Sequence, residues 1–274
     1  MNIYDLYEKI NSRTCVVIAS SPCYPYGLVD PIQKIGKICN HFDVPLHVDA
    51  CLGGFITQFD DDVKISFNDN ISSISVDPHK FGYAPKGSSL LLWKNNTIRH
   101  KQYFIYEKWT GGIYASPSLP GSRAGYQIAT TWAILMYNGF NKYKKMAKEI
   151  IKTTKHLSEC IQKIETFEVI GEPKVNVVSF YSNKYSLGQI ISEFKQNKWN
   201  LNIMQDPLCL HICITPYNLD KINEIIDILS EITKKEVEKV ESGLVSIYGM
   251  AEKIPDKTII DEIIEQYLDL TTDL

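Results

Sequence analysis

The first third of the chain alternates short apolar runs with amphipathic stretches. Apolar runs rich in β-branched residues predict four strands, at Thr14–Ser20, Pro45–Asp49, Ile71–Val76 and Ser88–Trp93. The isoleucines of Pro31–Phe42 recur on one helical face, which predicts a helix between the first two strands. Short, uninterrupted apolar strands are typical of a mostly parallel sheet that is buried on both faces. The pattern therefore predicts an α/β fold, in which ligands gather beyond the carboxyl ends of the strands.

Helical spacing of apolar residues also predicts a surface helix at residues 3–10 and two long helices farther on, at Gly125–Tyr137 and Tyr143–Lys163. The dipeptide Asn138-Gly139 offers a break between the two long helices. The segment Gly111–Arg123, by contrast, is too rich in Gly, Pro and Ser to predict regular structure.

The remainder of the chain has an α+β pattern. Its apolar runs predict strands at residues 166–170, 175–181 and 208–215, and its helical patterns lie at residues 186–197 and 222–232. We therefore expect a first domain at residues 1–138, a small C-terminal α+β domain at 139–240 and a tail segment at 241–274.

Composition and charge narrow the functional classes. The 274 residues include 29 Lys and Arg against 32 Asp and Glu, so the formal net charge is −3, which argues against a basic nucleic-acid binder. The seven cysteines stand singly, without a CxxC pair, and no secretory signal is evident. This pattern predicts reduced thiols in a cytosolic protein.

The longest uncharged run is Ala124–Asn141, which has 18 residues. Polar residues interrupt it, among them Gln127, Thr130 and Thr131. This run therefore predicts a buried helix or a helix at an interface, and we expect no membrane span in the chain.

The residues Cys209, His211 and Cys213 alternate along a predicted strand, so all three should point to one face. Side chains that alternate on a regular strand stand about 6–7 Å apart, whereas zinc needs its ligand atoms within about 2.3 Å of one centre. We expect these residues to pack in the core or at an interface, and we expect no metal site.

Two residues near the ends of neighbouring strands suggest cofactor chemistry. Asp49 ends one predicted strand, and Lys80 follows the next strand by four residues. An aspartate that faces the nitrogen of pyridoxal phosphate keeps this nitrogen protonated, and a nearby lysine forms the Schiff base. When each residue is considered alone, the alternative role of Asp49 is a helix cap or a surface carboxylate. The alternative for Lys80 is a solvated side chain. Lys86 is the competing lysine, but it lies farther from the strand end.

Four longer motifs carry a resemblance. HVDACLGG (47–54), SVDPHKFGYAPKG (75–87), GGIYASPSLPGSRAG (111–125) and SIYGMA (246–251) resemble the sphingosine-1-phosphate lyase family, a group of pyridoxal-phosphate enzymes among the group II decarboxylases. HVDA and the His-Lys pair are shared by the whole decarboxylase group, and the other motifs are narrower. The resemblance implies the C-terminal part of the large domain of the aspartate-aminotransferase fold (fold type I), followed by a small α+β domain.

The same resemblance implies roles for several residues. Lys80 would hold pyridoxal 5'-phosphate as a Schiff base, and Asp49 would pair with its ring nitrogen. His79 and Asp77 would lie near the cofactor phosphate, and Cys51 against the ring.

In this fold the active site forms between two subunits, and the GGIYASP segment resembles the part that reaches the partner's site. Tyr26 stands where many relatives carry histidine, which makes it a candidate acid/base group, with simple packing as the alternative. Further candidates for binding cofactor or substrate are Lys86, Gly111, Gly112, Tyr114 and Arg123. For Arg123, contact with a phosphate and an ordinary ion pair remain alternatives.

The reaction implied is a retro-aldol cleavage of sphingoid base 1-phosphates to a long-chain aldehyde and phosphoethanolamine. A pyridoxal-phosphate-dependent amino-acid decarboxylase is the enzymatic alternative, because it uses the same electron sink. An inactive fragment that acts as a binding or structural module is the alternative from another class.

Members of the family are much longer than this chain. We therefore expect an N-terminally truncated chain that lacks the glycine-rich phosphate segment and the residue stacked over the ring. The partners expected are a phosphorylated sphingoid base and either a second copy, as a homodimer, or a complementing N-terminal chain. The location expected is cytoplasmic, with association to the endoplasmic reticulum membrane through the missing part.

Overall fold

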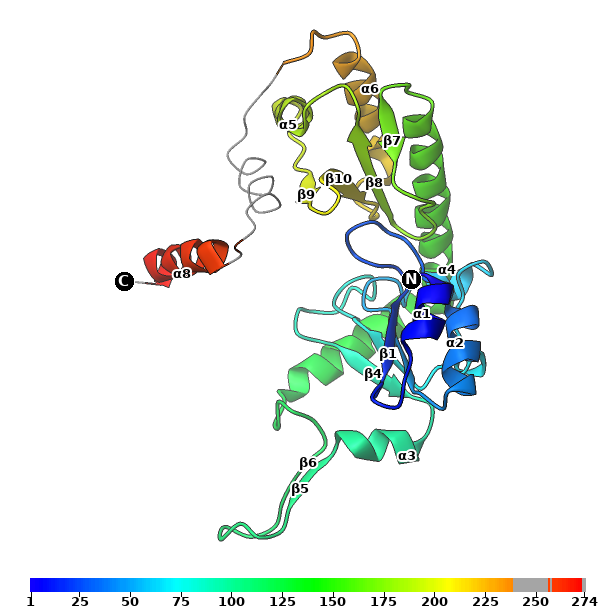
Figure 1. Cartoon of the computed structure of the whole chain (residues 1–274), viewed down its shortest axis with the longest axis vertical. Coiled ribbons are helices and arrows are strands. Elements are labelled where there is room, and N and C mark those ends of the chain that lie inside the picture. The colour runs from blue at the N-terminus through cyan, green and yellow to red at the C-terminus, as the bar shows by residue number, and fades with distance from the viewer. Residues whose placement is uncertain (239–255, 257, 273–274) are drawn as a thin grey trace. The chain divides into compact units, whose positions relative to one another are not determined.

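The computed structural model describes residues 1–238, 256 and 258–272 (Figure 1). The chain forms two compact units, of which the first comprises Met1–Lys155 with Glu172–Asn176 and the second comprises His156–Gly171 with Val177–Leu274. The division falls within helix α4 (Gly125–Gln162). The domain boundaries expected after residues 138 and 240 stay predictions.

A four-stranded sheet forms the centre of the first unit. Its strands lie in the order β1 (Val17–Ser20), β2 (Leu46–Asp49), β3 (Ser73–Val76) and β4 (Leu90–Trp93). β1 pairs with β2 and β2 with β3 in parallel, whereas β4 runs antiparallel to β3. Since β1 and β2 are joined through a helix, the α/β prediction for the first half is confirmed.

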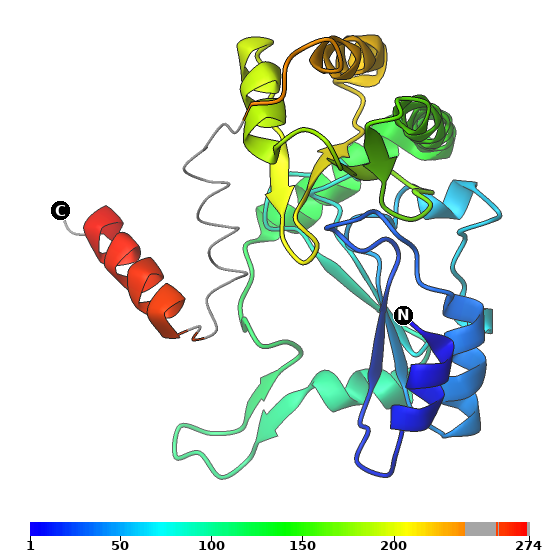
Figure 2. The ribbon, with the colours of Figure 1, turned by 45° about the horizontal axis from the view of Figure 1, so that its top comes forward.

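Two helices, α1 (Ile3–Lys9) and α2 (Ile32–His41), cover one face of this sheet (Figure 2). Ile32, Ile35 and Cys39 of α2 are buried against strand residues such as Leu46 and Val48. Because side chains alternate along a strand, the neighbours of Leu46 and Val48 point to the opposite face. The core therefore fixes which residues of β2 are directed away from α2.

The prediction for the fourth strand is partly wrong. β4 forms where the apolar run predicts it, but it is antiparallel, and Leu90, Leu91 and Leu92 are 41%, 42% and 41% exposed. β4 lies at the edge of the four-stranded sheet. Three successive apolar residues suit a strand that is covered on both faces, so its exposure marks a surface that a further segment can cover.

After β4 come the short helix α3 (Asn96–Arg99) and a hairpin of β5 (Phe104–Tyr106) and β6 (Tyr114–Ser116). Figures 1 and 2 both show the hairpin projecting from the body of the first unit. The expectation of irregular structure throughout Gly111–Arg123 is therefore wrong at β6. The aromatic and alanine residues of YAS pair with FIY of β5, and this cross-strand pairing outweighs the surrounding Gly and Pro.

Helix α4 contains the break expected near Asn138-Gly139, because Gly139 has a φ of 63° and a ψ of 170°. The first half of α4 exposes apolar side chains, with Ile128 and Trp132 each 65% exposed. This exposure contradicts the expectation of a buried helix, and the alternative of a helix at an interface stays a prediction. Within residues 1–238, 256 and 258–272, no helix is long and apolar enough to cross a membrane.

The second unit contains an antiparallel sheet in the order β7-β8-β10-β9. Its strands and helices are β7 (Phe167–Val169), β8 (Val177–Ser182), α5 (Leu187–Gln196), β9 (Asn202–Met204), β10 (Cys209–Cys213), α6 (Ile222–Ile232) and α8 (Thr258–Thr272). The α+β prediction is confirmed here, although the pattern did not predict β9 or α8. The motif SIYGMA (246–251) lies outside the described residues.

Strand β10 carries the three residues considered as metal ligands. His211 is 1% exposed, and its Nε2 lies 3.1 Å from Nδ2 of Asn202 on β9. Burial raises the pKa of the Cys209 thiol to about 11, which opposes the thiolate form that zinc binds. In the part of the chain that the structure describes, no group of three His, Cys, Asp or Glu side chains is arranged to hold a metal ion.

A close approach between α2 and a neighbouring turn gives the first test of this fold. A Cβ added to Gly36 would overlap the backbone carbonyl of Asp69, which cannot move as a flexible side chain would. We expect Gly36→Ala to lower the free energy of unfolding by about 1–3 kcal/mol, although alanine is the better helix former. Urea titration measures this change.

The matched control is Gly125→Ala at the start of α4, where an added Cβ meets nothing within 4 Å. This variant should be as stable as the wild type or up to about 1 kcal/mol more stable. Equal stability of the Gly36 and Gly125 variants would contradict the packing described for α2.

Candidate active site

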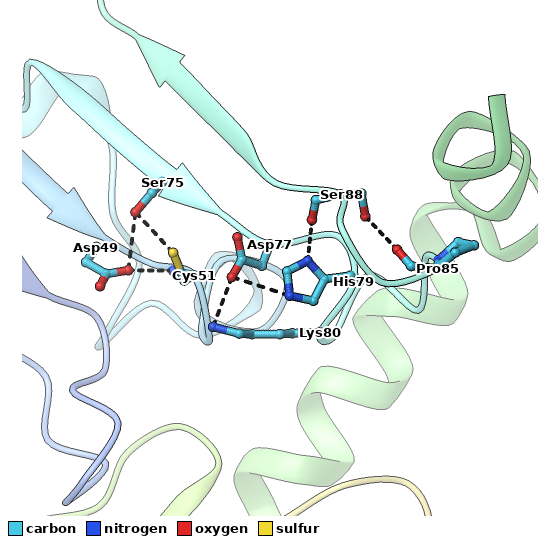
Figure 3. A network of polar contacts seen from close by, with 8 residues as sticks. All are labelled: Asp49, Cys51, Ser75, Asp77, His79, Lys80, Pro85 and Ser88. Atoms are coloured by element: carbon cyan, nitrogen blue, oxygen red, sulfur yellow. Dashed lines mark hydrogen bonds and ion pairs between the residues drawn. The ribbon is translucent and has the colours of Figure 1, made fainter. Parts of the chain in front are cut away.

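Asp49 is the last residue of β2, and its side chain points away from the core formed by Leu46 and Val48. The β2–β3 register places Ser75 directly beside it. Ser75 Oγ donates a hydrogen bond to Asp49 Oδ1 at 3.2 Å, and the amide of Cys51 donates to the same oxygen at 3.0 Å (Figure 3). The carboxylate is therefore held at the carboxyl end of the parallel strands, where ligands of α/β sheets bind.

The environment of Asp49 favours its ionised form. Burial alone would raise the pKa of this carboxyl, but the hydrogen bonds from Cys51 and Ser75 and the charge of Lys80 outweigh burial and lower the pKa. Asp49 is thus a carboxylate at neutral pH. Lys80 follows β3, which runs parallel to β2, so Lys80 and Asp49 lie at the same end of the sheet.

Lys80 belongs to a tight turn that follows β3. Its amide donates to the carbonyl of Asp77 at 3.0 Å, and the amide of Ala84 donates to the carbonyl of Pro78 at 2.9 Å. Lys80 Nζ lies 2.9 Å from Asp77 Oδ2, and the lysine side chain is 37% exposed. The turn therefore presents an amine that is anchored by one carboxylate and remains accessible.

Asp77 is the counter-ion of Lys80 in this turn. Burial would raise the pKa of its carboxyl, but hydrogen bonds from Ser89 and Lys80 and the lysine charge lower it. His79 completes the group, with Nε2 3.8 Å from Asp77 Oδ2 and Nδ1 bonded to the backbone carbonyl of Ser88. Since a carbonyl only accepts, Nδ1 carries a proton and Nε2 faces the carboxylate (Figure 3).

Helix α4 packs against this turn and bonds to its backbone. Tyr143 is 5% exposed, and its hydroxyl donates to the carbonyl of Gly82 at 2.7 Å. A Cβ on Gly82 would lie 2.6 Å from the Pro78 carbonyl oxygen and 2.8 Å from the ring of Phe55. The turn that carries Lys80 is therefore packed too closely to move freely.

The support from α4 can be tested by removing one hydroxyl. Tyr143→Phe leaves the Gly82 carbonyl without this donor in a buried site, so we expect the free energy of unfolding to fall by about 1–3 kcal/mol. Tyr137→Phe is the control, because Tyr137 is 80% exposed on the same helix. Urea titration of both variants measures the difference, and a loss of similar size in both would contradict the role given to Tyr143.

The other predicted site residues lie on other segments of the chain. Tyr26 is half-buried in the loop after β1, and Lys86 is exposed before β4. The remaining residues lie in or near the hairpin and are exposed: Gly111, Gly112, Tyr114 and Arg123. Among the described residues, no hydrogen bond or ion pair joins Lys86 or this exposed set to Asp49, Asp77 or Lys80. The structure thus brings together Asp49, Cys51, Asp77, His79 and Lys80, while the roles of all the predicted residues stay predictions.

The sequence reasoning missed Ser75 and Ser88, which hold Asp49 and His79. A signal for Ser75 is present, because polar residues stand at every second position from Ser73 through Ser75 to Asp77, the residue directly after β3. The same spacing relates His47, Asp49 and Cys51 on the neighbouring segment. Ser88 acts through its backbone carbonyl, for which the side-chain pattern gives no signal.

Comparison with known proteins agrees with this geometry. Residues 11–183 match the family model described as the pyridoxal-dependent decarboxylase conserved domain. The chain belongs to the pyridoxal-dependent decarboxylase family. Within this family, it is 35% identical to sphingosine-1-phosphate lyase 1 of Mus musculus over 100% of this chain and 50% of that protein. It is 36% identical to the sphingosine-1-phosphate lyase of Dictyostelium discoideum over 96% of this chain and 51% of that protein.

Solved structures show the same fold. A sphingosine-1-phosphate lyase from Burkholderia pseudomallei matches with a TM-score of 0.87 and 31% identity, over 100% of this chain and 60% of that one. A glutamate decarboxylase from Lactobacillus brevis matches with a TM-score of 0.73 and 17% identity, over 85% of this chain and 58% of that one, and indicates the fold alone. The expected resemblance and the fold type I class are confirmed. The chain spans about half the length of the lyase relatives that it matches in sequence.

Proposed function

We propose that this chain carries the cofactor-anchoring part of a pyridoxal-phosphate-dependent lyase that cleaves sphingoid base 1-phosphates. The observation that carries the proposal is the position of Asp49 and Lys80 at the same end of two adjacent parallel strands. An ionised carboxylate and an accessible amine are the two groups that this cofactor requires from the protein. The similarity of the whole chain to sphingosine-1-phosphate lyases supports the choice of substrate.

The residues present fit the cofactor. When bound, pyridoxal phosphate supplies an aldehyde that condenses with amines and a ring that accepts the electron pair of a bond broken beside the nitrogen. Lys80 is the amine that would hold it, and the Asp49 carboxylate would keep a proton on the ring nitrogen. Cys51 is the candidate for contact with the ring, and His79 with Asp77 for the region of the phosphate.

Asp77 has a second role in this proposal. Its carboxylate holds the Lys80 ammonium at 2.9 Å, which fixes the amine in the turn. A lysine attacks an aldehyde only as the neutral amine, so the proton on Nζ has to leave before Lys80 can react. Asp77 therefore orients the lysine amine within the turn.

The cleavage itself requires a base for the substrate's C3 hydroxyl. Loss of this proton forms the aldehyde as the bond between C2 and C3 breaks, and C2 keeps the electron pair and is later protonated. The products are a long-chain aldehyde and phosphoethanolamine. We propose Tyr26, in the loop after β1, as the acid/base group of this chain.

The lyase is favoured over an amino-acid decarboxylase by the pattern of identities. Sphingosine-1-phosphate lyases from mouse, slime mould and yeast are 35%, 36% and 33% identical to this chain. The glutamate decarboxylase structure, at 17% identity, supports the shared fold without indicating a substrate.

We also propose that the site is completed by a second chain, either another copy or a complementing N-terminal chain. β1 and β4 are the outer strands of the four-stranded sheet, and the exposed leucines of β4 and the 58% exposed Ile18 of β1 leave apolar surface there that a further segment can cover. The residues Gly111, Gly112, Tyr114, Lys86 and Arg123 are the candidates for contact with the partner's site or with the substrate. The cytoplasmic location and the association with the endoplasmic reticulum stay predictions.

The proposal is tested by titrating the purified chain with pyridoxal phosphate and following the visible absorption of the lysine-bound cofactor. We expect this band in the wild type and in Lys86→Ala, and its loss in Lys80→Ala. Lys86 is the matched control because it is an exposed lysine that lies six positions after Lys80. A band that survives in Lys80→Ala and disappears in Lys86→Ala would show that Lys86, and not Lys80, binds the cofactor. Absence of the band from the wild type would contradict cofactor binding by this chain.

A further inference from the structure

We infer that Ser75 is a positioning residue that fixes the Asp49 carboxylate for the cofactor's ring nitrogen. This inference rests on the proposed function. Ser75 Oγ donates to Asp49 Oδ1 at 3.2 Å, and the amide of Cys51 donates to the same oxygen at 3.0 Å. Because both donors converge on Oδ1, they restrain rotation of the carboxylate and direct Oδ2 to the remaining partner.

The sheet places Ser75 where it can do this. Asp49 and Ser75 are partners in the parallel register of β2 and β3, so the serine hydroxyl lies directly beside the carboxylate. Asp49 ends its strand, and beyond it the backbone turns into the segment that contains Cys51. Without the two donors, a short carboxylate at a strand end would rotate among several orientations.

The thiol of Cys51 sets the direction of the serine hydroxyl. Cys51 Sγ donates to Ser75 Oγ at 3.3 Å, so the single hydroxyl hydrogen of Ser75 is left for Asp49 (Figure 3). Burial, followed by the neighbouring Asp49 carboxylate, raises the pKa of the thiol to about 11. The thiol therefore keeps its proton at neutral pH and continues to donate. Cys51 and Ser75 therefore both act as donors around the Asp49 carboxylate.

The same strands supply a matched control. Two residues earlier, Ser73 lies beside His47 in the register, and its Oγ is 2.8 Å from His47 Nδ1. Ser73 thus has the same chemistry, strand and sheet face as Ser75, but its hydroxyl bonds to His47 and not to Asp49. If serine hydroxyls in this sheet have only a structural role, Ser73→Ala and Ser75→Ala should affect the Asp49 titration and cofactor binding equally.

The first measurement uses the chain without cofactor, with carbon-13 at the aspartate carboxyl groups and Asp49→Asn to assign the Asp49 signal. We expect Ser75→Ala to raise the pKa of Asp49 relative to the wild type, because the carboxylate loses a donor. Ser75→Thr, which keeps the hydroxyl, and Ser73→Ala should titrate as the wild type does. The charged or titratable groups near Asp49 are Lys80, His47 and Cys51, and all three are unchanged in these variants, as is Asp77.

The second measurement is the apparent Kd of pyridoxal phosphate from its absorption. Ser75→Ala should bind roughly tenfold more weakly, with Ser75→Thr and Ser73→Ala close to the wild type. An Asp49 titration that Ser75→Ala leaves unchanged overturns the inference, and so does a shifted titration with an unchanged Kd. If the wild type shows no lysine-bound cofactor, the proposed function fails, and the titration alone then decides whether Ser75 holds Asp49.

Discussion

The parallel pairing of β2 with β3 is the interaction on which the rest of the site depends. It sets Asp49 beside Ser75 and directs the chain beyond β3 into the turn that carries Lys80. The buried neighbours Leu46 and Val48 prevent a slip of one residue, because such a slip would turn Asp49 into the core and an apolar side chain out of it. A hydrophobic constraint therefore decides where the charged groups lie.

The second requirement is rigidity beyond the strands. Lys80 lies in a turn, and turns move unless their backbone is bonded or packed. Here the backbone hydrogen bonds around Pro78, the close approach of Gly82 and the hydroxyl of Tyr143 act together. Asp77 then orients the lysine side chain within this fixed backbone. The fold thus positions the amine in two steps, first the turn and then the side chain.

Much of this arrangement could be predicted from the sequence, and the failures have identifiable causes. The period of the apolar residues predicted β2, β3 and α2, and hence the shared position of Asp49 and Lys80. It did not reveal the direction or the exposure of β4, because an apolar run has the same pattern whether or not other segments pack against it. It also missed β6, whose residues pair with β5 residues that lie well before them in the sequence, such as Phe104 with Ser116. Ser75 was missed because a small polar residue within a strand is common, and only the register shows what it faces.

Lys80 is the residue that we propose binds pyridoxal phosphate. The most direct test is to add less than one equivalent of the cofactor to the purified chain, reduce the Schiff base with borohydride and locate the pyridoxyl group by peptide mass spectrometry. We expect modification at Lys80, and strongly reduced labelling when Asp49 is replaced by Asn. Modification at Lys86 in place of Lys80, or no more labelling at Lys80 than at the other exposed lysines, would contradict it.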